Sequence, residues 1–95
     1  KSSNLTAKIS TLEDNFAGSA PDLNALLTSQ KTSSLVMRTF VSSALNSPIP
    51  GSGICFSYRT DSQNYGAQLV LSDRGIHYRG YSGAAFGAWV KVATA

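Results

Sequence analysis

The sequence predicts a mainly β protein, in which an N-terminal helix forms a short coiled-coil stalk and a small antiparallel β-sheet forms a knob. In the first 16 residues, apolar side chains recur at spacings of four and three, as in the seam of a heptad repeat. From residue 54 onward, apolar and polar residues alternate in short segments divided by turns, which is typical of antiparallel strands with one buried face. We therefore place the stalk at residues 1–32 and the β-knob at residues 33–95.

The composition narrows the class of protein. A chain of 95 residues forms one small domain, with or without an appendage, and oligomerisation would help so small a core. Charged residues make up only 14% and the net charge is +3, a weak argument for nucleic acid binding. No apolar run approaches the roughly 20 residues of a membrane span. Because the chain begins at Lys1 without Met, we treat it as the C-terminal piece of a longer protein.

The seam in the first helix covers only two residues in seven, so it predicts contact with partner helices; a surface helix of a monomer is the alternative. Residues 18–21 interrupt this helix, and Ser19 with Asp22 matches a capping box for a second helix over residues 21–30. Counting by heptads returns this second helix to the same seam, so the break bends the stalk without ending it. The predicted oligomerisation residues are Leu5, Ile9, Leu12, Phe16, Leu23 and Leu26.

After a polar linker, the pattern changes to strands. Residues 35–41 are rich in β-formers and either face could be buried, while residues 44–53 form a long loop with two prolines and two glycines. Residues 54–60 alternate cleanly, with Ile54, Phe56 and Tyr58 on one face. A turn at residues 61–64 leads into the last third of the chain.

The last third, residues 67–92, reads as a meander of three strands with turns at residues 73–75 and 81–83. In the middle strand, Ile76 and Tyr78 are expected to face the core, and His77, Arg79 and Tyr81 to be exposed on the opposite face. The first strand separates Ala67, Leu69 and Leu71 from Gln68 and Val70, and the third separates Phe86 from Trp89.

The knob carries an excess of aromatic and basic side chains. Tyr and Trp can present an apolar ring to a sugar, and Arg can form paired hydrogen bonds to carboxylate or phosphate. Packing within the protein is the alternative role for each of these residues. The candidates for receptor binding are Arg59, Tyr65, His77, Arg79, Tyr81 and Trp89.

The residues favour no catalytic or metal centre. Glycoside hydrolysis needs two carboxylates beside one bond, but Asp61 and Asp73 are the only acidic residues in the knob and both lie in turn sequences. His77 has no nucleophile elbow near it, and Cys55 is expected to be a buried thiol. We therefore predict a protein that is not an enzyme and binds neither a cofactor nor a metal.

Residues 35–93 resemble the knob domain at the C-terminus of phage tail fibres, tailspikes and pyocin fibres. The matching motifs are the loop Asn46-Ser47-Pro48 leading into Gly51-Ser52-Gly53, the strand Tyr78-Arg79-Gly80-Tyr81 and the closing Trp89-Val90-Lys91-Val92. Members of the family typically close with two tryptophans spaced W-x-x-W, whereas this chain has Phe86 at the earlier position.

The resemblance implies a virion protein: a homotrimeric, extracellular fibre tip that attaches to a bacterial surface saccharide or an outer-membrane receptor. It implies no nucleic acid partner and no membrane insertion. Two alternatives are a trimerisation and folding cap that does not recognise a receptor, and, more remotely, a small β-barrel that binds single-stranded nucleic acid.

Overall fold

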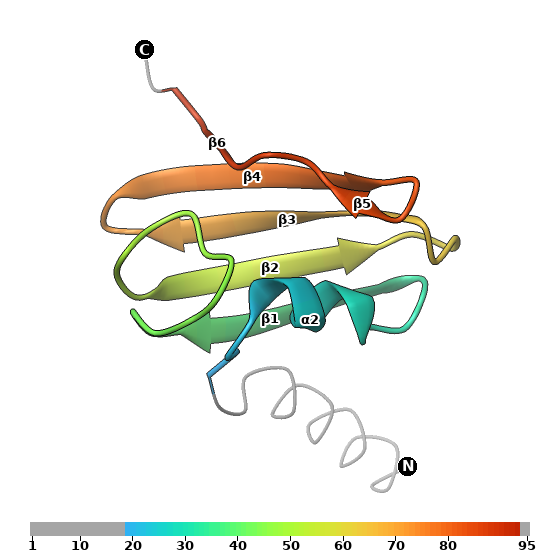
Figure 1. Cartoon of the computed structure of the whole chain (residues 1–95), viewed down its shortest axis with the longest axis horizontal. Helices are drawn as coiled ribbons and strands as arrows, with labels where there is room; N and C mark the ends of the chain where they lie inside the picture. Colours follow the sequence, from blue (N-terminus) through green and yellow to red (C-terminus); the bar gives the residue numbers. More distant parts are fainter. Residues whose placement is uncertain (1–18, 94–95) are drawn as a thin grey trace, which may run out of the picture.

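The computed structural model describes residues 19–93 (Figure 1). The predicted seam residues Leu5, Ile9, Leu12 and Phe16 therefore lie outside the described residues. The elements in chain order are α2 (Leu23–Thr28), β1 (Ser34–Phe40), β2 (Gly53–Arg59), β3 (Tyr65–Ser72), β4 (Gly75–Ser82), β5 (Ala85–Phe86) and β6 (Val90–Lys91).

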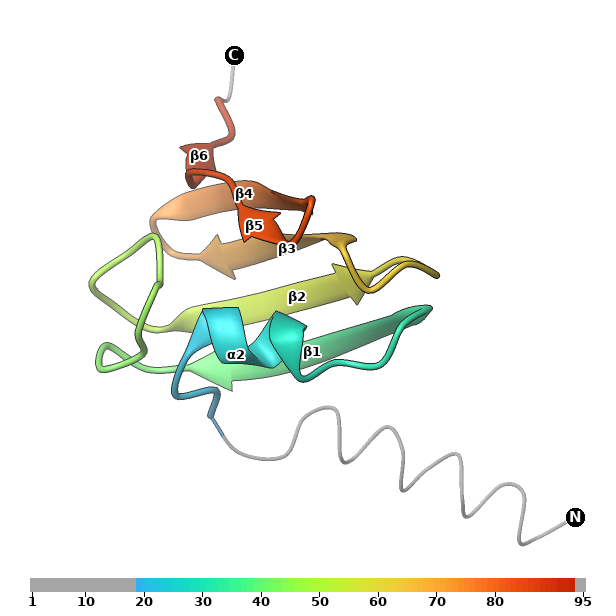
Figure 2. The same ribbon diagram turned by 45° about the vertical axis from the view of Figure 1, so that its right-hand side comes forward.

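All strands belong to one antiparallel sheet with the order β1-β2-β3-β4-β5. The short strands β5 and β6 both pair with β4 and follow one another along its free edge (Figure 2). The prediction of a mainly β protein with a small antiparallel sheet is confirmed. Within residues 19–93, no helix is long and apolar enough to cross a lipid bilayer.

The two turns of the predicted meander are present, but the second lies further along the chain. The first joins β3 to β4 at Asp73-Arg74, inside the predicted range. The second falls at Gly83-Ala84, because β4 continues to Ser82. Gly83 and Ala84 have φ values of 59° and 60°, the left-handed pair that a two-residue type I′ hairpin requires.

The edge strand beside β4 contains an extra residue. Phe86 pairs with Tyr81 and Val90 pairs with Tyr78, so three residue steps along β4 face four along its partner. Such a bulge reverses the alternation of side chains beyond it. Phe86 and Trp89 consequently lie on the same face, and the prediction that they oppose each other is wrong.

Helix α2 begins later than predicted. Its N-cap is Asp22, not Ser19: Asp22 Oδ1 accepts a hydrogen bond from the Asn24 backbone N–H (3.0 Å) and another from Asn46 Nδ2 (2.8 Å). The helix packs on the sheet through Leu23 and Leu27, which are fully buried. Leu23 thus belongs to the core of its own chain, which contradicts the prediction that it continues a seam between helices.

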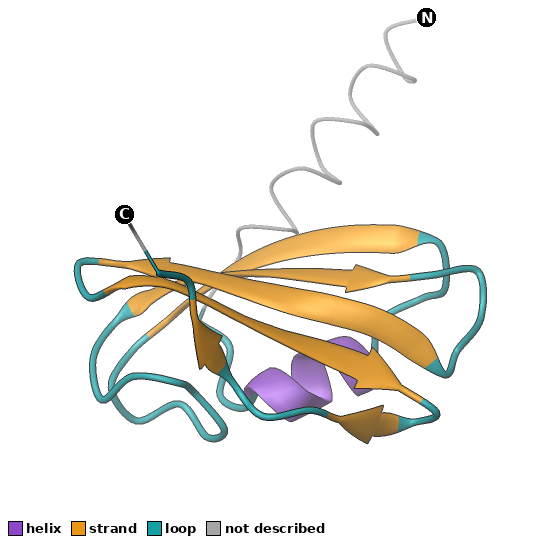
Figure 3. Cartoon of the chain, turned by 90° about the horizontal axis from the view of Figure 1, so that it is seen from above, coloured by secondary structure: helices purple, strands orange, loops and turns teal. Residues whose placement is uncertain are grey.

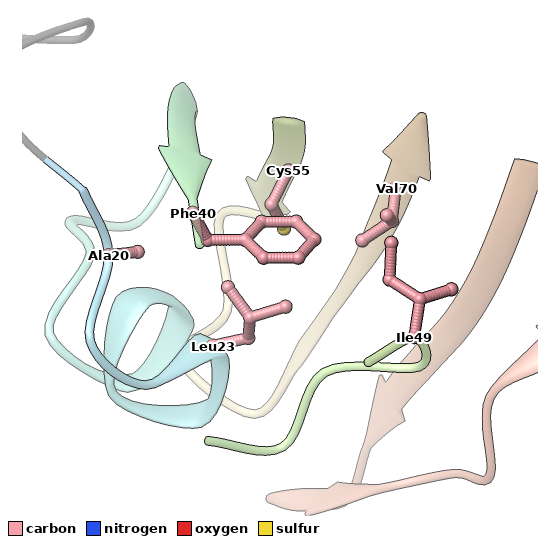
Figure 4. Packing of buried hydrophobic residues seen from close by; sticks show 6 residues of the cluster. All are labelled: Ala20, Leu23, Phe40, Ile49, Cys55 and Val70. Atoms are coloured by element: carbon pink, nitrogen blue, oxygen red, sulfur yellow. The ribbon is translucent and has the colours of Figure 1, made fainter. Parts of the chain in front are cut away.

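The core lies between the sheet and α2, on what we call the covered face. Phe40, Cys55 and Val70 project from β1, β2 and β3 toward Leu23 of the helix and Ile49 of the β1–β2 loop (Figure 4). Figure 3 shows α2 on one side of the sheet. Burial of these apolar side chains is the main contribution to the stability of the knob.

The opposite face of the sheet, which we call the open face, is not the one expected to be exposed. Antiparallel partners share a face, so the register places Leu69 beside Tyr78 and Leu71 beside Ile76. Gln68 and Val70 are buried on the covered face. The predicted orientation of the middle strand is therefore wrong. The large apolar side chains that remain exposed on the open face include Leu35, Tyr58, Leu69, Leu71, Tyr78 and Val90.

Candidate functional site

Five of the six candidate receptor-binding residues are buried or half-buried, and only Tyr65 is well exposed. Tyr65 retains 49% of its accessible surface, whereas Arg79 and Tyr81 retain 5% and 7%. The expectation that Arg79 and Tyr81 are exposed is therefore wrong.

Arg79 lies at the centre of a polar network inside the covered face. Its Nε and Nη2 donate to Gln68 Oε1 at 2.9 and 2.7 Å, and Nη2 also donates to Asn24 Oδ1 at 2.7 Å. Gln68 Nε2 in turn donates to the Leu23 carbonyl at 2.6 Å and to Ser57 Oγ at 3.2 Å. The network connects α2 to three strands through groups that would be costly to bury unpaired.

The guanidinium of Arg79 lies over two aromatic rings. Its Cζ lies 4.0 Å from the centroid of Phe86 and 4.5 Å from that of Trp89. Burial lowers the pKa of Arg79 to about 10, while Cys55 and Asp22 oppose the shift. No carboxylate in residues 19–93 forms an ion pair with Arg79. The charge is instead held by neutral oxygens and ring faces, an arrangement that suits a planar guanidinium.

Tyr81 and Trp89 complete this stacked cluster. The Tyr81 ring lies 4.7 Å from the Phe86 ring, tilted by 53°, and Trp89 Nε1 donates to the Asn46 carbonyl at 2.9 Å. Trp89 also packs against the core. Their contacts join the edge strands to the β1–β2 loop and leave little ring surface for a ligand.

Arg59 connects the segment at the end of α2 to the β2–β3 turn through hydrogen bonds. Its Nη1 donates to the carbonyls of Thr28 and Gln30 at 3.1 and 2.6 Å, and its Nη2 donates to the Gln63 carbonyl at 2.6 Å. The side chain thereby satisfies carbonyls at the C-terminal end of α2 and just after it, where a helix leaves acceptors unpaired. His77 is half-buried, and its Nδ1 is buried without a partner in the described part of the chain.

Sequence reasoning missed Gln68, Asn24 and Gln30, which carry much of the buried hydrogen bonding. Gln30 Nε2 donates to the carbonyls of Ser57 and Ser34 at 2.7 and 2.9 Å. Gln68 was the available signal, because a long amide among Leu and Val residues in a strand needs partners if that face is covered.

The carboxylates of the knob do not form a pair within one chain. Asp61 precedes β3 and Asp73 follows it, so the two lie at opposite ends of an eight-residue strand. At about 3.3 Å per residue, this strand spans roughly 25 Å, far beyond the roughly 5–9.5 Å that separates glycosidase carboxyl groups. Among residues 19–93, no group of His, Cys, Asp and Glu is arranged to hold a metal ion.

Two hollows lie beside each other where α2 meets the edge strand β1. Their volumes are about 380 and 320 Å³, and they share Leu26, Ser29 and Arg38 in their linings. Leu26, a predicted seam residue, is partly buried against the core of its own chain. Arg38 Nη1 donates to the Met37 carbonyl at 3.1 Å, so this cation is already partly engaged.

Cys55 is fully buried, as expected, and burial raises the pKa of its thiol from 9.0 to about 12 despite the charge of Arg79. Because the pKa is raised in the folded state, the contribution of the neutral thiol to the free energy of unfolding is complete below pH 9. This contribution is lost as the pH rises toward 12. The lowered pKa of Arg79 acts in the opposite direction, but only above pH 10.

We therefore expect the stability advantage of the parent over Cys55→Ala to fall by about 1 kcal/mol between pH 8 and pH 10. Urea unfolding of both chains at each pH measures this difference, and the other titrating groups cancel between them. A constant difference across this pH range would contradict the assignment of a buried neutral thiol.

No family model matches the chain, and neither a curated protein nor a solved structure matches it significantly.

Proposed function

We propose that the chain is the homotrimeric C-terminal tip of a phage tail fibre or tailspike and that it attaches the virion to a receptor on the bacterial surface. The resemblance of residues 35–93 to fibre knobs supports this proposal. The structural observation that carries it is a pair of accessible tyrosine rings, Tyr58 and Tyr65, each 49% exposed, at one end of the open face.

The surroundings of these two rings suit a saccharide. Tyr58 pairs with Ala67, which in turn pairs with Gly80, so the residues on the β3 side of the ring are small, while Leu35 lies on its β1 side. Tyr65 stands two residues before Ala67 and shares its face. Exposed rings beside small residues offer flat apolar surface with a hydroxyl at the tip, which matches the mixed apolar and polar faces of a sugar.

The second candidate is a trimerisation and folding cap that does not contact a receptor. It is favoured by the internal use of Arg59, Arg79, Tyr81 and Trp89, all of which bond or stack within their own chain. The same observation argues against single-stranded nucleic acid, because two arginines and a tryptophan are already engaged in contacts within the chain.

The test is binding of the purified chain to host cells or to a glycan array after Tyr65→Ala and Tyr58→Ala substitution. We expect the double variant to bind at least about tenfold more weakly, as for aromatic anchors of other interfaces. Leu45→Ala is the control, because Leu45 is exposed but lies in the β1–β2 loop, outside the open face.

The outcomes separate the two candidates. Loss of binding with an unchanged melting temperature supports attachment through these tyrosines. Undiminished binding by the double variant would contradict it. A parent chain that associates but binds no cell surface would instead support the cap.

A further inference from the structure

The open face is apolar and uncharged across strands β1 to β6. The six large apolar side chains named above for it are each at least 36% exposed. They come from β1, β2, β3, β4 and β6, and Leu69, Tyr78 and Val90 lie side by side in one row across three of those strands. The basic side chains of the strands, such as Arg38 and Arg79, lie on the covered face, since they alternate with Met37 and Tyr78.

The size of this face matches the largest apolar patches of monomeric proteins. With strands about 4.8 Å apart and a rise of about 3.3 Å per residue, five strand positions and six residues give roughly 480 Å². The largest apolar patch on a typical monomer reaches about 300–600 Å² and is often functional. The area is more than half of the roughly 800 Å² that each partner contributes to a stable interface, so the face is large enough to form the centre of one.

We infer that the open face packs against the open faces of other copies of this chain, and that the row of Leu69, Tyr78 and Val90, together with Leu71, forms the contact. Interface cores are depleted of charge and enriched in Tyr, Phe and Met. The open face combines Tyr78 with Phe56 and Met37, and its described strands carry no charged side chain there. A neutral apolar surface of this kind offers nothing to a charged partner, but it complements itself in a symmetric assembly.

The point where the described chain begins supports a second copy as the occupant. Ser19 forms a parallel bridge with Thr39, and the backbone N–H of Ala20 donates to the Thr39 carbonyl at 2.8 Å, so the described chain begins beside the end of β1. Thr39 pairs with Ile54, which places its side chain on the open face. Copies that associated through the predicted heptad seam would therefore be joined near the β1 edge of the sheet, which borders the open face.

This inference rests on the proposed homotrimer only for the number of copies. Attachment through Tyr58 and Tyr65, at the rim of the face, is measured by cell or glycan binding, whereas association is measured by mass. Failure of one is therefore distinguishable from failure of the other.

The experiment compares Leu69→Lys with Leu45→Lys in the full chain. Both place a lysine at an exposed leucine, but only Leu69 lies at the centre of the open face. Light scattering over a dilution series measures the mass of each. We expect the parent and Leu45→Lys to form the same oligomer, and Leu69→Lys to associate at least about tenfold more weakly, because an ammonium would be desolvated without a partner.

A further variant distinguishes association through the open face from association through the predicted helical seam. If Ile9→Asp dissociates the oligomer while Leu69→Lys does not, the seam alone joins the copies and the inference is wrong. A monomeric parent at about 100 µM, a concentration at which even weak specific interfaces are occupied, would also overturn it.

A cross-linking measurement decides the matter if Leu69→Lys fails to fold. Cys55 is fully buried, so a cysteine introduced by Leu69→Cys is the accessible thiol of the described residues. Under mild oxidation we expect Leu69→Cys to form disulfide-linked copies and Leu45→Cys to remain largely unlinked. Equal linkage of the two variants, or linkage of neither, would overturn the inference.

Discussion

Substitution of Arg79 by alanine is expected to lower the free energy of unfolding by about 3–4 kcal/mol. The substitution leaves Gln68 Oε1 and Asn24 Oδ1 without their donor, inside a face from which water is excluded. It also removes the guanidinium that lies over the rings of Phe86 and Trp89. Chemical denaturation of the purified variant measures the loss.

Two further arginine variants show whether the network, rather than charge alone, is responsible. Arg74→Ala removes the same charge from an exposed turn and is expected to change stability by less than about 0.5 kcal/mol. Arg79→Lys keeps the charge but cannot stack as a plane or bond through two nitrogens, so it should still cost more than Arg74→Ala. If Arg79→Ala were no more destabilising than Arg74→Ala, the network would not contribute to stability.

Replacement of Phe40 by alanine is expected to cost about 3–5 kcal/mol, the usual range for a large aromatic side chain in a core. Phe40 is 1% exposed and lies against Leu23 and Cys55 at the end of β1. Its ring also lies close above Gly53, where a Cβ added to the glycine would come within 2.9 Å of Cζ. The alanine variant therefore leaves a cavity that the surrounding backbone cannot readily close.

The neighbouring position supplies the control for this prediction. Val41 is the next residue but is 47% exposed, so Val41→Ala should change the unfolding free energy by less than about 0.5 kcal/mol. Similar losses in the two variants would mean that the core does not lie on the covered face.

The alternation of side chains was enough to predict the strands, but not the face on which the helix packs. Hydropathy favours burial of Leu69 and Ile76 over Gln68 and Arg79. In the structure, however, Gln68 and Arg79 are buried on the covered face, and Leu69 and Ile76 lie on the open face. The reason is that Gln68 and Arg79 find partners on α2, namely the Leu23 carbonyl and the Asn24 side chain. A burial that depends on hydrogen bonds between distant segments leaves no periodic signal in either segment.

Two further differences have local causes. The extra residue between Phe86 and Val90 moves Trp89 to the face of Phe86, and no spacing rule reveals a bulge in a strand this short. At the helix start, both Ser19 and Asp22 are suitable caps, and the amide of Asn46 is the additional donor that favours Asp22. Of the six candidates for receptor binding, Tyr65 is exposed, while the other five pack or form hydrogen bonds within the chain or are half-buried.

The stacking of Phe86 and Trp89 on Arg79 has a consequence for how a newly made chain matures. Until these two rings have emerged from the ribosome, the guanidinium lacks its aromatic contacts, and hydrogen bonds to Gln68 and Asn24 alone hold it against the helix. We therefore expect the knob of a nascent chain to remain incompletely packed until synthesis has passed Trp89. Chains that terminate before this residue should be degraded by proteases instead of assembling with full-length copies.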